Sequence, residues 1–134
     1  MRKMKPLRLL SDSQMLDKQI KARKTYLREQ RRARDELEKI LSRESAARLL
    51  PAVAGYENQL VRDTARLLGL KTKIQHMIAD LNGWERLVME LRYIHHLKWD
   101  AVAEHTKYSL RVVHRIHKEA MEKLYALYGE RNIS

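Results

Sequence analysis

The stretch WDAVAEHTKYSLRVVHRIHK, residues Trp99–Lys118, predicts two short helices separated by a tight turn. We expect the first helix over Trp99–Thr106 and the second from Ser109 to about Tyr128. The connection, which starts at Lys107, is only a few residues long. Two helices joined so closely must cross at a steep angle, so the stretch has the pattern of a helix-turn-helix.

Apolar residues occur where a helix-turn-helix needs them. Val102 and Ala103 would face inward on the first helix, and at Ala103 a larger side chain would push the two helices apart. Tyr108 supplies the apolar residue of the turn. Val113 and Ile116 are three residues apart, which places both on the inward side of the second helix.

Four positions around the turn bear on how well the pattern fits. Ser109 is a good N-cap, because its hydroxyl can accept a hydrogen bond from an amide of the first turn. Lys107 replaces the glycine that is frequent in this turn, at a cost of roughly 1 kcal/mol if its φ is positive. Thr106 stands where an aliphatic residue is usual, and Lys98 where a capping Ser or Thr is expected.

The outward side of the second helix predicts binding to double-stranded DNA. Cationic side chains on the exposed N-terminal half of a helix can reach base edges and phosphates in the major groove. Either Arg111 or Arg115 could hold a guanine through two hydrogen bonds, worth about 1–3 kcal/mol of discrimination. An ordinary helical hairpin with a polar face is the alternative. The predicted DNA-binding residues are Lys107, Ser109, Leu110, Arg111, His114, Arg115 and Lys118.

Composition agrees with a polyanionic partner. The 134-residue chain has a formal net charge of +11, which suits nucleic acid or an anionic membrane surface. Residues 1–48 contain 15 Lys and Arg against 7 Asp and Glu, a surplus of +8. With only four Gly and two Pro, turns are scarce and the helices must be long. The absence of cysteine excludes disulfides and cysteine zinc sites and is compatible with a reducing cytoplasm.

The first 82 residues predict a basic helical hairpin. We expect one helix over Ser13–Leu50, a break marked by Pro51 and Gly55, and a second helix over Tyr56–Leu81. The second helix has apolar residues seven apart, which indicates pairing with the first helix or with a second chain. A homodimer is therefore one of the expected assemblies. Those residues are Leu60, Leu67, Ile74 and Leu81.

A cluster of arginines within the first helix is a candidate DNA-backbone contact. Each phosphate that such a residue neutralises would steepen the salt dependence of binding by about 0.9 log units. The alternative is a solvated helix face, which is what charge runs usually form. The candidate backbone contacts are Arg28, Arg31, Arg32 and Arg34.

Asn82 and Gly83 end the hairpin, and a further helix is expected over Trp84–Leu97. Its aromatic residues, together with Trp99, are expected to clamp the short helices rather than stack on bases. The sequence therefore predicts an all-α protein, with a long N-terminal helical hairpin followed by a C-terminal trihelical helix-turn-helix unit. The expected domains are residues 1–82 and 83–134.

The sequence gives little indication of metal binding or catalysis. His114 and His117 share a helical face, as metal ligands would, but no cysteine or well-placed carboxylate completes a site. His114 is better explained as facing DNA and His117 as flanking it. No nucleophile, base and acid set appears, so we expect no enzyme activity, no metal and no cofactor. We also expect no signal peptide and no membrane span, and hence a cytoplasmic protein.

The stretch LNGWERLVMELRYIHHLKWDAVAEHTKYSLRVVHRIHKEAMEKL, Leu81–Leu124, resembles region 4 of bacterial sigma factors. It is more similar still to small phage-encoded late-transcription activators of the RinA/ArpU type. The resemblance implies transcription control at a phage promoter, in a bacterial host and with host RNA polymerase as a partner. The shared residues are Leu91-Arg92-Tyr93, Trp99, Ala103, Tyr108-Ser109, Arg111, Val113-His114-Arg115, His117, Glu119-Ala120 and Leu124.

Two other functions remain open at this point. A small terminase-like DNA-packaging protein would also use a helix-turn-helix, and it should assemble into a ring. An adaptor for host RNA polymerase or for a membrane surface would not bind duplex DNA. The basic hairpin could hold the DNA backbone, mediate dimerisation or contact RNA polymerase.

Overall fold

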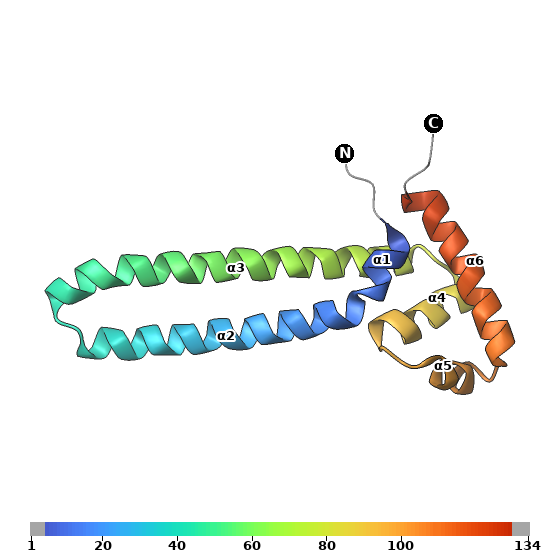
Figure 1. Ribbon diagram of the computed structural model, residues 1–134, viewed down its shortest axis with the longest axis horizontal. Helices are drawn as coiled ribbons and strands as arrows, with labels where there is room; N and C mark the ends of the chain where they lie inside the picture. The colour runs from blue at the N-terminus through green and yellow to red at the C-terminus, as the bar shows by residue number, and fades with distance from the viewer. Residues whose placement is uncertain (1–4, 130–134) are drawn as a thin grey trace. The chain divides into compact units, whose positions relative to one another are not determined.

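The computed structural model describes residues 5–129, and in this range the chain is helical almost throughout and contains no strand (Figure 1). The prediction of an all-α fold is confirmed. Backbone contacts divide the chain into two compact units, one over Leu16–Gly69 and the other from the remaining residues on either side of it. The elements are α1 (Pro6–Ser11), α2 (Ser13–Ile40), α3 (Arg43–Ala79), α4 (Gly83–Met89), the π-helix η1 (Glu90–Ile94), α5 (Trp99–Thr106) and α6 (Leu110–Tyr128).

The unit over Leu16–Gly69 is a hairpin in which α2 and α3 run antiparallel (Figure 1). Leu16, Ile20 and Leu60 are its buried aliphatic residues. The polar residues that interrupt the apolar stripe of α2 pair across to α3. Arg23 lies 3.3 Å from Asp63, and Arg34 is paired in the same way further along. The hairpin is therefore held by ion pairs as well as by apolar packing.

The position of the turn between these helices differs from the prediction. The break lies at Leu41 and Ser42, and Pro51 lies inside α3. The hydroxyl of Ser42 accepts a hydrogen bond from the amide of Ser45 at 3.2 Å, which caps the new helix. An interior proline costs about 3 kcal/mol in an isolated helix. Packing of a long apolar face decides helix boundaries more strongly than such propensities do.

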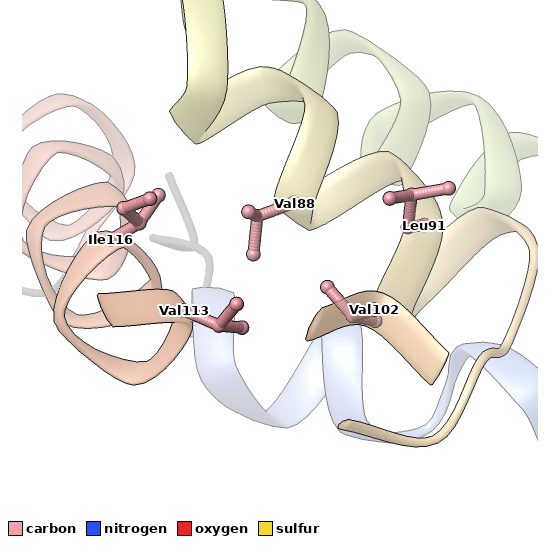
Figure 2. Close-up of a cluster of buried hydrophobic side chains, with 5 residues drawn as sticks. All are labelled: Val88, Leu91, Val102, Val113 and Ile116. Carbon is pink, nitrogen blue, oxygen red and sulfur yellow. The ribbon is translucent and has the colours of Figure 1, made fainter. Parts of the chain in front are cut away.

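The C-terminal helices enclose a separate core. Val88 and Leu91, from α4 and η1, meet Val102 of α5 and Val113 and Ile116 of α6 (Figure 2). Partly buried residues cover this cluster: Leu87, Leu97, Trp99, Ala103, Tyr108 and Val112. Helix α1 packs against α6 in the same unit. The expected three-helix arrangement is confirmed, and α1 is an addition that the sequence did not predict.

The helix expected over Trp84–Leu97 ends earlier. It changes to a π-helical turn, in which the amide of His95 donates to the carbonyl of Glu90 at 3.0 Å. His96 then takes a left-handed conformation with φ 59°, which ends the helix. The guanidinium of Arg92 donates to the carbonyl of Leu97 at 2.9 Å and so satisfies an oxygen that the helix no longer reaches.

Candidate nucleic-acid interface

The turn between α5 and α6 has the geometry that the sequence predicts. Lys107 has φ 65° and ψ 14°, so it occupies the left-handed conformation that glycine favours. Thr106 is buried, and its hydroxyl donates to the carbonyl of Val102 at 3.0 Å. The hydroxyl oxygen of Thr106 also accepts a hydrogen bond from the amide of Tyr108 at 3.4 Å. A threonine can therefore replace the usual aliphatic residue, because its polar atom is satisfied locally.

The second helix begins at a capped end. The hydroxyl of Ser109 accepts a hydrogen bond from the amide of Val112 at 3.3 Å, as predicted. Helix α5 lacks such a cap, because Lys98 makes no side-chain hydrogen bond there. The cap fixes where α6 begins, and hence which residues occupy its first exposed turn.

The residues expected to point inward do so together. Val102 and Val113 are fully buried, and Ile116 is 7% exposed. Ala103 and Tyr108 are partly buried against the same cluster. This core holds α5 against α6 (Figure 2), and residues on the opposite side of the first turns of α6 are exposed. The predicted DNA-binding residues all lie on that exposed side: Lys107, Ser109, Leu110, Arg111, His114, Arg115 and Lys118.

Unpaired positive charge gathers on this exposed side. Within residues 5–129, neither Arg111 nor Arg115 forms an ion pair, and the same holds for Lys107 and Lys118. Two other cations of the same unit do form ion pairs, Lys123 with Glu85 at 2.6 Å and Arg86 with Glu90 at 2.7 Å. The exposed start of α6 can therefore accept phosphates or base edges without first breaking an internal salt bridge.

An aromatic cluster supports the middle of α6. The ring of His114 lies 4.9 Å from that of Trp99, measured between centroids. The guanidinium of Arg92 also lies over Trp99, 4.6 Å from the ring centroid. Trp99 packs against the apolar core, so the imidazole of His114 is held at the edge of the interface rather than projecting freely. Trp84 is different, because it is 48% exposed and contacts the edge of Tyr108.

His117 belongs to the support of α6 rather than to its exposed side. Its Nε2 lies 2.8 Å from the hydroxyl of Tyr93, and its ring meets Trp99 edge-on. Burial, with smaller contributions from His114 and Arg92, lowers the pKa of His117 to about 4. Burial also raises the pKa of Tyr93. Sequence reasoning missed this pair, because its partners are 24 residues apart and no local spacing relates them.

The arginine run of α2 divides between two environments. Arg28, Arg31 and Arg32 are exposed. Arg34 instead lies in the seam of the hairpin, where its Nη1 is 2.7 Å from the Oε2 of Glu57. The helix turns through about 100° per residue, so consecutive arginines cannot share one side.

Comparison with known families agrees with this geometry. The family model for Sigma-70, region 4 matches residues 77–126, from the end of α3 through most of α6. This part of the chain is thus similar to Sigma-70, region 4, and its geometry is that of a helix-turn-helix. No curated protein and no solved structure matches the chain.

Over residues 5–129, no three His, Cys, Asp or Glu side chains come together in a way that could hold a metal ion. In the same range no helix combines the length and the apolar character needed to cross a membrane.

Proposed function

We propose that this protein is a sequence-specific DNA-binding regulator of transcription, which reads a promoter with the N-terminal half of α6. The observation that carries the proposal is the pair Arg111 and Arg115. Both are exposed and unpaired, and both lie on a capped helix that a buried core holds in place. They are four residues apart, so they lie on one side of the helix.

The neighbouring residues suit particular parts of a DNA duplex. A bidentate guanidinium is the usual partner of the O6 and N7 atoms of guanine. Leu110 is 42% exposed in the first turn of α6, where an apolar side chain can contact the methyl group of thymine. Lys107, beside the turn, and Lys118, one turn beyond Arg115, are placed for phosphates. Phosphate contacts would set the position of the helix, and base contacts would set its sequence preference.

We assign the protein, more narrowly, to the activators of phage late genes. The support is the set of residues shared with RinA/ArpU-type regulators, which includes Arg111, Val113 and Arg115. Arg111 and Arg115 are two of the exposed cations of α6, and Val113 is one of the buried residues beneath them. The region 4 match is also consistent with action beside bacterial RNA polymerase. On this proposal Arg28, Arg31 and Arg32 add contacts to the DNA backbone.

Selection of bound sequences from a random pool of duplexes, followed by affinity measurement, tests the main proposal. We expect Arg111→Ala or Arg115→Ala to reduce discrimination between selected and mixed-sequence DNA by about 5- to 150-fold, which corresponds to 1–3 kcal/mol. Arg66→Ala, which removes an exposed cation from the hairpin, is the matched control and should retain the discrimination.

Discrimination that survives both substitutions in α6 would exclude this use of the helix. The narrower role has its own readout, which is transcription by bacterial RNA polymerase from a template that carries the selected sequence. Added protein should increase the transcript. Unchanged or reduced transcription would contradict an activator while leaving sequence-specific binding intact.

A further inference from the structure

One edge of α2 carries four cations in an unbroken row. Lys21, Lys24, Arg28 and Arg31 are separated by three, four and three residues, which is the spacing of neighbours on one side of a helix. All four are exposed. None of them forms an ion pair with any residue in the described range 5–129. We call this set the basic edge.

The contacts of the hairpin show which of its two faces contains the basic edge. Tyr26 and Tyr56 touch through their hydroxyls at 3.0 Å and mark one face, where Asp63 also pairs with Arg23. The basic edge lies on the opposite flank of α2, because its residues follow the other side of the apolar stripe. The part of α3 on that flank is uncharged, with Ala54, Val61 and Ala65 exposed or nearly so.

The basic edge coincides only in part with the arginine run that is conspicuous in the sequence, because the two sets share Arg28 and Arg31. Arg32, four residues after Arg28, borders the edge on the outer side of α2, whereas Arg34 is held by Glu57 in the seam. The other two members of the basic edge are lysines from the preceding turns of α2, Lys21 and Lys24. The part of α3 on this side adds no carboxylate, and the nearest carboxylates on the same side of α2, Asp17 and Asp35, lie only at the two ends of the row, four residues before Lys21 and four after Arg31.

We propose that the basic edge is a second DNA contact, which binds consecutive phosphates of one strand independently of base sequence. This inference rests on the proposed function, because it takes duplex DNA as the polyanion. Ten residues of helix separate Lys21 from Arg31, a length of about 15 Å at 1.5 Å per residue. One DNA strand presents a phosphate about every 3.4 Å along the duplex axis, so a row of this length is long enough to reach several phosphates of the backbone.

Salt dependence of binding to a short duplex of mixed sequence provides the test. Neutralising four phosphate contacts should reduce the slope of log affinity against log salt by about 3.6. Between about 50 and 200 mM salt, the wild-type protein should then lose about 150-fold more affinity than the variant. Glutamine preserves helix propensity, and circular dichroism checks the helix content. The variant combines Lys21→Gln, Lys24→Gln, Arg28→Gln and Arg31→Gln.

A matched control removes the same charge from the same hairpin. Four exposed arginines of α3 have no ion pair within residues 5–129, so their loss should leave the hairpin folded. We expect this control to change the slope by less than about 1, a single phosphate contact. The control combines Arg43→Gln, Arg48→Gln, Arg62→Gln and Arg66→Gln.

Each other outcome overturns the proposal in a recognisable way. An unchanged slope in the basic-edge variant shows that these residues do not bind phosphate, while sequence discrimination by α6 can persist. An equal drop in the control indicates general attraction by net charge rather than a defined contact. If the variant loses binding only to vesicles of phosphatidylserine and phosphatidylcholine, the edge contacts lipid. If the wild-type protein binds no duplex at all, both this inference and the proposed function are overturned.

Discussion

Protonation of His117 should destabilise the C-terminal helices at mildly acid pH. Its pKa is lowered from 6.5 to about 4, because burial of the ring disfavours the charged form and the neighbouring His114 and Arg92 add smaller contributions. Above pH 6.5 the ring is neutral in both the folded and the unfolded chain, so its contribution to stability is complete. As the pH falls toward 4, His117 becomes protonated in the unfolded chain while it stays mostly neutral in the folded chain. The free energy of unfolding therefore decreases.

The expected loss follows from the size of the pKa shift. A shift of about 2.5 units corresponds to at most about 3 kcal/mol once the pH is below 4. At about pH 5 the unfolded histidine is almost fully protonated and the folded one is mostly neutral, so the loss there is at most about 2 kcal/mol, and about 1–2 kcal/mol once the exposed part of the ring is taken into account. Such a loss is a large fraction of the stability of a small domain.

Urea unfolding, monitored by tryptophan fluorescence, measures the stability of the unit that contains His117. The chain has two tryptophans, Trp84 and Trp99, and both lie among the C-terminal helices. His117→Gln provides the reference, because glutamine does not titrate while the other five histidines remain. The substitution also removes a hydrogen bond with Tyr93, but that loss does not vary with pH over this range.

The free energy of unfolding of the wild type should fall, relative to the variant, by about 1–2 kcal/mol between about pH 7.5 and pH 5. Parallel pH profiles for the two proteins would refute the reasoning, since His117 would then titrate equally in the folded and unfolded chains. Direct titration of the His117 ring by NMR offers an independent check, and a folded-state pKa near 6.5 would lead to the same conclusion.

Two substitutions in the turn test its local geometry, with the same urea titration as the measurement. Lys107→Gly should raise the free energy of unfolding by roughly 0.5–1 kcal/mol, because glycine avoids the left-handed penalty but gives up more entropy on folding. A destabilised glycine variant would show that the φ of 65° carries no strain. Ser109→Ala should lower the free energy of unfolding by about 1 kcal/mol, because it removes the hydrogen bond from the amide of Val112 to the Ser109 hydroxyl. An unchanged free energy of unfolding would mean that the cap does not contribute to stability.

Interactions between near neighbours in the chain could be predicted from the sequence. The bounds of α5, the cap at Ser109 and the left-handed turn at Lys107 depend on a few adjacent residues. The inward set from Val102 to Ile116 follows from helical periodicity in the same short stretch. The prediction of exposure for the cationic side of α6 had the same basis, since that side is what remains when the apolar residues face inward.

Other features depended on contacts between distant parts of the chain. Pro51 and Gly55 predicted a break that the structure places at Leu41 and Ser42, because packing along α3 outweighs the cost of an interior proline. The pairing of Arg34 with Glu57 removed one arginine from the surface run. No spacing in the sequence relates such partners, so local patterns could not identify them.

The order of residues by itself determined that this chain is helical, basic and built around a helix-turn-helix, because periodicity, capping and turn conformation act over a few residues. Tertiary structure alone decided which cations remain unpaired and which histidine stays neutral. Ion pairing and burial depend on side chains that folding brings together from distant positions, as it does for Tyr93 and His117.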